Sequence, residues 1–217
     1  MQPIQHFRRF VGHHPLLGSV LWLSTIQFFI TQIIVAFAWS NPPYSWDRMT
    51  ISELGATICG QVDGRYMCSP MHSLMNGSFV VLGLAMFIGS VLLYLKLRRS
   101  RAGFTLMAIA GAGAMMVGFV PMDTIYWLHI VGADTAFLLG NIALIVFGLT
   151  LGLPNWFKWY SIVSGIIALL GLVLFFTHTH FLLGLGGMER VVAYPMVAWM
   201  FVFAVYSMRN QTQGSVK

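Results

Sequence analysis

Six long apolar segments dominate this sequence of 217 residues and decide which solvent surrounds it. As a helix rising about 1.5 Å per residue, each segment is close to the ~30 Å thickness of a bilayer core. The segments cover approximately residues 17–39, 71–95, 102–120, 128–151, 159–177 and 191–208. We therefore predict an all-α integral membrane protein, a bundle of six transmembrane helices.

The composition agrees with this prediction and bounds the domain organisation. Only 8% of the residues are charged, against about 25% in soluble domains. No stretch outside the apolar segments could form a second globular domain. The chain divides into a segment 1–16, a membrane domain 17–208 with a long loop 40–70, and a tail 209–217. The net charge of +6 comes from cations in short loops, which indicates contact with lipid head groups and no nucleic acid.

The positive charges also predict the orientation of the bundle. With six spans, nine of the twelve Lys and Arg residues fall on one side of the membrane, which the positive-inside rule makes cytoplasmic. We expect both termini there, in a plasma or inner membrane. These nine cations are Arg8, Arg9, Lys96, Arg98, Arg99, Arg101, Lys158, Arg209 and Lys217. Asp47, Glu53, Asp63, Asp123, Asp134 and Glu189 all fall toward the other side, so we expect the polar chemistry in the outer half.

The loop 40–70 carries the only two cysteines, Cys59 and Cys68. In an oxidising compartment a separation of nine residues allows a disulfide; two free thiols are the alternative. Earlier in the same loop, residues 49–55 read as a short interfacial helix ended by Gly55.

Two groups of polar residues lie at the outer ends of the second and fourth segments. His72 and Asn76 are four residues apart and share one helix face. Asp123, His129 and Asp134 lie on and before the fourth segment, and an ionisable residue within a span usually faces the bundle interior. Each group can equally serve to hold helices and loops together.

A third group precedes the last apolar segment. His178 and His180 would point the same way in an extended chain. The glycines at 184, 186 and 187 suggest a tight turn, after which Glu189 and Arg190 would open the helix. A structural ion pair between these two residues is the simpler alternative.

Histidines and carboxylates at one membrane depth are the usual ligands of zinc or a similar divalent ion. The candidate ligands are His72, His129, His178 and His180. No compact motif such as His-Glu-x-x-His is present. Haem is disfavoured, because only His72 and His129 could ligate it axially and no Cys-x-x-Cys-His motif exists.

Several short motifs resemble the bacterial and archaeal membrane family catalogued as domain of unknown function 998. The resemblance covers residues 15–208 and implies six spans, but it brings no assigned chemistry. The motifs are the runs at residues 51–55, 69–76 and 187–190, together with Pro121 and the His129-x-x-Gly132-Ala133 pattern.

Two functional hypotheses remain open. The first is a lipid-directed, metal-assisted hydrolase or transferase, with His72, His129 and Asp134 catalytic. Its substrate would be bound by Asn76, Asp123, Glu189 and Arg190. The second is a non-catalytic lipid-binding, transport-accessory or sensory protein. A pure transporter is disfavoured, because no charge lies near the bilayer midplane and no apolar segment looks broken. The sequence leaves the oligomeric state open.

Overall fold

The computed structural model describes residues 17–62, 64–97 and 99–214. The segment 1–16 with Arg8 and Arg9 lies outside the described residues, as do Asp63, Arg98 and Lys217.

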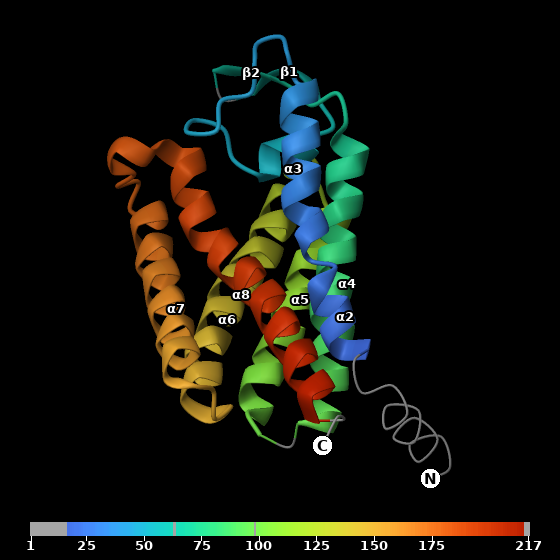
Figure 1. Ribbon diagram of the computed structural model, residues 1–217. Coiled ribbons are helices and arrows are strands. Elements are labelled where there is room, and N and C mark those ends of the chain that lie inside the picture. The colour runs from blue at the N-terminus through green and yellow to red at the C-terminus, as the bar shows by residue number, and fades with distance from the viewer. Residues whose placement is uncertain (1–16, 63, 98, 215–217) are drawn as a thin grey trace.

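Six helical spans form the bundle, as predicted, so the protein is a multi-pass helical membrane protein (Figure 1). The first span consists of α2 (Leu17–Leu23) and α3 (Ile26–Ala38). The others are α4 (His72–Lys96), α5 (Arg101–Phe119), α6 (Tyr126–Thr150), α7 (Asn155–Phe176) and α8 (Gly184–Gly214). Large apolar side chains such as Phe37 and Leu170 are exposed on the outside of the bundle, where the lipid chains would contact them.

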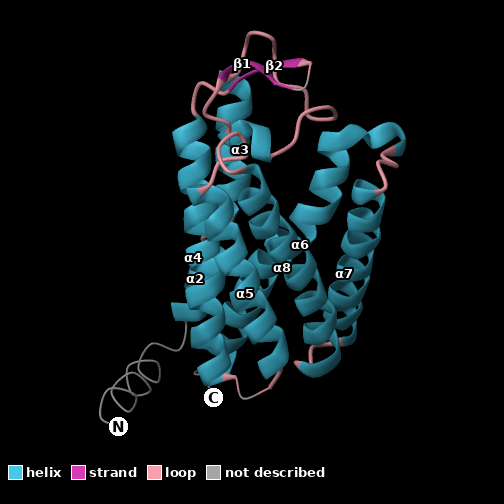
Figure 2. Cartoon of the chain, turned by 180° about the vertical axis from the view of Figure 1, so that it is seen from behind, coloured by secondary structure: helices cyan, strands magenta, loops and turns pink. Residues whose placement is uncertain are grey.

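The two ends of the bundle differ (Figures 1 and 2). One end, which we call the hairpin end, carries the antiparallel strands β1 (Cys59–Val62) and β2 (Arg65–Cys68). At the opposite end, the basic end, α2 begins, α8 ends, and α4 connects to α5 and α6 to α7. Cys59 lies opposite Cys68 in the strand register, and the two form the predicted disulfide.

Small residues bring the central helices into contact. A Cβ atom on Gly83 of α4 would lie 2.5 Å from the carbonyl oxygen of Gly111 of α5. A Cβ atom on Gly113 of α5 would lie 2.5 Å from the carbonyl oxygen of Gly132 of α6. Because these backbones touch, glycine is required at the crossings. Gly111 and Gly113 therefore bring α5 into close contact with α4 and α6.

The first span is interrupted, which the sequence analysis did not expect. The helix stops between α2 and α3 at two hydroxyl residues. Ser24 Oγ donates to the Leu21 carbonyl and Thr25 Oγ1 to the Trp22 carbonyl, each at 2.7 Å. These bonds compete with the regular helical hydrogen bonds and end the first helix.

The last helix begins earlier than predicted, because the glycines before residue 191 belong to it. Gly184, with φ +66°, starts α8. The N–H of Gly186 donates to the Asp47 carbonyl at 2.8 Å. A Cβ atom on Gly186 would lie 2.1 Å from the Met49 carbonyl oxygen. These glycines therefore let the loop lie directly on the helix backbone, and Glu189 stands beyond the first turn.

Candidate functional site

A short segment of the loop, residues 50–56, enters the hairpin end of the bundle, and we call it the plug. It contains the 3₁₀ helix η1 (Ser52–Gly55). Ile51 and Leu54 are 2% and 0% exposed. The helix expected around Gly55 is therefore present, but it is buried in the bundle and does not lie on the membrane surface.

Two residues at the start of α4 and just before it hold the plug. Ser69 Oγ donates to the Leu54 carbonyl at 2.6 Å. Asn76 Nδ2 donates to the Gly55 carbonyl at 2.8 Å. These bonds satisfy buried backbone carbonyls. Asn76, a predicted substrate-binding residue, thus has a structural partner in the plug.

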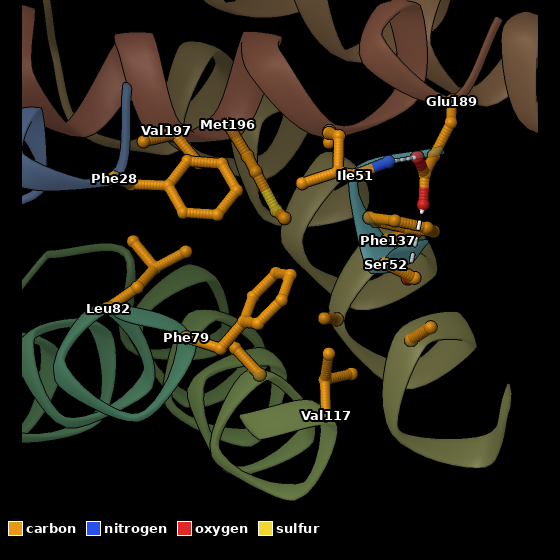
Figure 3. Close-up of a pocket in the computed structure, with 14 residues that line it drawn as sticks. Phe28, Ile51, Ser52, Phe79, Leu82, Val117, Phe137, Glu189, Met196 and Val197 are labelled. Carbon is orange, nitrogen blue, oxygen red and sulfur yellow. Dashed lines mark hydrogen bonds between the residues drawn. The ribbon is translucent and has the colours of Figure 1, made fainter. Parts of the chain in front are cut away.

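Glu189 reaches the plug from the opposite side, on α8. Its carboxylate is 4% exposed and accepts a hydrogen bond from the backbone N–H of Ile51. Its other oxygen lies 3.3 Å from Ser52 Oγ. Figure 3 shows both contacts as dashed lines. The last helix therefore fixes the position of Ser52.

His129 approaches Ser52 from α6. Its Nδ1 lies 2.7 Å from the Val120 carbonyl oxygen. Because a carbonyl can only accept, Nδ1 carries a hydrogen. The other ring nitrogen, Nε2, lies 3.0 Å from Ser52 Oγ. The imidazole is 2% exposed, and the carbonyl fixes its orientation toward the serine.

Two hydrogen bonds join the three side chains through Ser52. Ser52 Oγ contacts both His129 Nε2 and Glu189 Oε1, and each contact needs one hydrogen between its two heavy atoms. The serine hydroxyl supplies only one. The second must come from the Glu189 carboxyl or from Nε2 of a doubly protonated His129. The chain Glu189–Ser52–His129 is therefore a path along which a proton can move between carboxyl and imidazole.

A narrow cavity lies beside Ser52 and Glu189, on the side of these residues that faces the bundle interior (Figure 3). Ser52 and Glu189 form its polar edge. The remaining wall is apolar and comes from α3, α4, α5, α6 and α8, including Phe28, Phe79, Val117, Ala133 and Met196. Its volume is about 30 Å³, enough for two or three water-sized groups. Such a cavity has room for the last two or three carbons of an apolar chain and excludes a bulky ring system.

Asp134 does not take part in this cluster. Both nitrogens of His129 are already bonded, one to Val120 and the other to Ser52. Five residues along an α-helix correspond to about 140° of rotation, which turns Asp134 away from the imidazole. Asp134 therefore makes no hydrogen bond to His129, and its expected catalytic role stays a prediction.

The four histidines proposed as metal ligands do not meet. Nδ1 of His72 lies 3.3 Å from Ser73 Oγ at the exposed start of α4. The rings of His178 and His180 are 5.9 Å apart, in the connection between α7 and α8. Within residues 17–62, 64–97 and 99–214, no group of three His, Cys, Asp or Glu could hold a metal ion. The zinc hypothesis has no ligand cluster there.

Arg190 holds the first part of the loop. Its Nη1 donates to the carbonyls of Trp46, Met49 and Gly186 at 2.8–3.1 Å. Its Nη2 donates to Tyr44 Oη at 2.6 Å. The guanidinium also lies 4.8 Å from the Trp46 ring centroid. Burial raises the pKa of Tyr44, although the charge of Arg190 acts in the opposite direction.

Asp123 ties the loop to the α5–α6 connection. Its Oδ2 accepts hydrogen bonds from the Thr57 N–H, the Thr57 hydroxyl and the Ile58 N–H at 2.7–2.9 Å. Partial burial raises the pKa of this carboxyl, but the hydrogen bonds outweigh burial and hold it below its usual value. Its role here is structural.

Nothing in the sequence pattern set Ser52 apart as a candidate site residue. Ser52 lies in the motif at residues 51–55, between a buried isoleucine and a glutamate. The presence of a hydroxyl residue in that motif was the signal that could have identified it as a candidate. The hairpin was missed as well, although Asp63-Gly64 between two short runs is a typical hairpin turn.

A family model described as "protein of unknown function (DUF998)" matches residues 22–206. No curated protein and no solved structure matches the chain.

Proposed function

Because this chain belongs to the family described as protein of unknown function (DUF998), which comes with no assigned reaction, we propose a function from its own geometry. The protein is a lipid-directed membrane enzyme that hydrolyses or transfers an acyl group. Ser52 is the nucleophile and His129 is the base.

The contact between Ser52 Oγ and His129 Nε2 carries this proposal. At 3.0 Å it lies within the range expected for a nucleophile and its base. The Val120 carbonyl holds the imidazole in the tautomer that can accept the serine proton. A third group that orients the base is the arrangement found in nucleophilic acyl transfer.

The reaction proceeds in two steps. Ser52 Oγ attacks the ester carbonyl carbon while its proton passes to His129 Nε2. The ester C–O bond breaks, and the leaving alcohol takes the proton from the imidazole. Water or an acceptor hydroxyl then gives a proton to His129 and attacks the acyl carbon. The bond between the acyl carbon and Ser52 Oγ breaks, the acid or new ester leaves, and Ser52 Oγ recovers the proton from the imidazole.

The neighbouring groups support the same chemistry. Glu189 is a positioning residue, because it holds both the Ile51 N–H and the Ser52 hydroxyl. When His129 is the neutral base, the Glu189 carboxyl carries the second hydrogen and donates it to Ser52 Oγ, which keeps the serine hydroxyl directed at Nε2. The apolar cavity begins at Ser52 and suits the end of one acyl chain.

An alkyl fluorophosphonate tests the proposal, because it reacts with an activated serine. The full chain is purified in detergent and incubated with the probe, and the labelled residue is found by peptide mass spectrometry. We expect labelling at Ser52, none in Ser52→Ala, and a rate at least ~100-fold lower in His129→Asn, since general bases contribute about 10²–10⁴.

Ser73→Ala is the matched control. Ser73 also contacts a histidine, His72, at 3.3 Å, but both stand at the exposed start of α4. Its labelling should equal that of the wild type. A folded wild-type protein that is not labelled, or a label that persists in Ser52→Ala, overturns the enzyme proposal.

The almost wholly apolar wall of the cavity favours a second candidate function, non-catalytic lipid binding. This function needs the cavity but not the proton chain. A protein that retains a lipid through purification equally well with and without Ser52, and that resists the probe, would have this second function.

A further inference from the structure

A second hollow opens at the basic end, between α7 and α8. Trp156 of α7 lines it, together with residues of the last part of α8. Its volume is about 370 Å³, which far exceeds that of the cavity beside Ser52. Arg209 in this groove lies twenty residues after Glu189 on α8, or about 30 Å along the helix. The groove is therefore a separate site.

The lining residues change character along α8. Val202 and Val205 give an apolar wall, and Arg209 and Asn210 follow where the helix reaches the basic end. Between them, the rings of Trp156 and Tyr206 lie 6.2 Å apart in an edge-on arrangement. Trp and Tyr mark the depth of lipid head groups. Along the groove, an apolar wall is followed by the aromatic pair and then by a cation and an amide. A phospholipid has the same order, from its apolar chains to its polar head group.

The charges at this end have one sign. Lys96, Arg99, Arg101, Lys158 and Arg209 are its described charged residues. The acids that the structure describes all lie toward the hairpin end: Asp47, Glu53, Asp123, Asp134 and Glu189. The field at the groove therefore favours an anion. A second copy of the chain would bring a like-charged surface to the same place, which disfavours it as the occupant.

We propose that this groove binds one anionic phospholipid. An acyl chain lies against Val202 and Val205, and the phosphate lies beside Arg209, whose planar guanidinium can hold two phosphate oxygens at once. Trp156 and Tyr206 flank the glycerol region. The proposal does not depend on any role of Ser52.

Native mass spectrometry of the delipidated full chain in detergent tests this site. Phosphatidylglycerol and phosphatidylcholine with identical chains are titrated separately. We expect one phosphatidylglycerol to bind well before any phosphatidylcholine. Arg209→Gln should weaken that binding about tenfold or more, because a hydrogen-bonded charge pair is lost. Val205→Trp should prevent binding by filling the groove while leaving the charge in place.

Lys158→Gln is the matched control. It removes one positive charge from the same end, but Lys158 lies over the Trp159 ring, 5.8 Å from its centroid, and does not line the groove. Its affinity should stay within about twofold of wild type. Equal losses in Lys158→Gln and Arg209→Gln would mean only general surface attraction and would overturn the site.

Three further outcomes also contradict the proposal. Equal binding of the two lipids would remove the anionic preference. Displacement of the lipid by inorganic phosphate or glycerophosphate alone at equal concentration would identify a free-phosphate site. A dimer mass that Val205→Trp disrupts, without bound lipid, would identify a second copy as the occupant.

Discussion

Single residues around the plug show how neighbours in sequence serve different parts of the molecule. Glu189 turns to Ile51 and Ser52, whereas Arg190 turns to Tyr44 and Trp46. The two side chains thus hold the two halves of one loop instead of each other. Arg190 donates to three backbone carbonyls and a phenol, while its buried Nε has no hydrogen-bond partner. Its expected part in substrate binding stays a prediction.

The partners of these residues could not be derived from the sequence. The sequence predicts that His129, Glu189 and Asp123 gather at one end of the bundle, because depth follows from position within an apolar segment. It does not predict that His129 meets Ser52, since that contact joins residues 77 positions apart through the folding of an irregular loop. No periodicity describes such a loop, and so Ser52 was missed.

Asp123→Asn should remove a pH-dependent part of the stability. The pKa of Asp123 is held below its usual value in the folded protein. Its contribution is therefore present above the unfolded-state pKa of about 3.9 and is lost as the pH falls through the lower folded-state value. At neutral pH we expect the variant to lose about 1 kcal/mol, or roughly 2–4 °C in Tm.

Thermal unfolding in detergent, measured from pH 7 to pH 3, checks this prediction. The difference in Tm between wild type and Asp123→Asn should shrink as the pH falls. Asp47→Asn is the control: Asp47 also has a lowered pKa, chiefly through its hydrogen bond with Ser45, but its carboxylate is exposed. A difference that stays constant over the whole range would contradict the role of ionised Asp123.

At the scale of helices, backbone contact decides the packing of the bundle. Length and hydropathy predict the six spans, and the small residues of 111–114 predict one close crossing. The interruption at Thr25 was not predictable in this way, because hydropathy does not distinguish a continuous helix from one whose hydroxyls bond to its own carbonyls. The early start of α8 was also unpredictable, since glycines favour a turn unless another segment packs on them.

Gly111→Val should separate α4 from α5. A Cβ atom on Gly111 would lie 2.7 Å from the Gly83 carbonyl oxygen and 2.7 Å from the Phe87 backbone nitrogen, and backbone atoms cannot move aside as a flexible side chain would. We expect a loss of several kcal/mol, about the size of other severe overpacking changes. Gly77→Val on α4 is the control, because nothing lies within 4 Å of its Cβ position.

Thermal unfolding and size-exclusion chromatography of the two variants provide the measurement. Gly111→Val should aggregate or unfold well below the wild type, while Gly77→Val should elute and unfold with it. Equal stability of the two variants would show that the α4–α5 crossing can open without cost.

The whole molecule is polarised between its two ends. The cations at the basic end predict that it faces the cytoplasm, and the disulfide of Cys59 with Cys68 suits an oxidising space at the hairpin end. The proposed acyl chemistry and the proposed phospholipid groove would then act on opposite leaflets.

Reporter fusions test this orientation. A green fluorescent protein attached after residue 217 should fluoresce, because it folds in the cytoplasm, and an alkaline phosphatase fused after Thr124, at the hairpin end, should be active outside it. A phosphatase that is active at the C-terminus and inactive after Thr124 would reverse the assignment, and the disulfide would then need another explanation.

The anchoring of the plug by α8 has a consequence for how the protein is made. The ribosome completes the plug between the first and second spans long before it reaches Glu189, which holds Ile51 and Ser52 of that plug. During translation the Ser52 region therefore lacks its contact with α8 until that final helix has entered the membrane. A nascent chain that stops after the fifth span would carry the proposed nucleophile, Ser52, and the proposed base, His129, without Glu189, which holds Ser52 from α8.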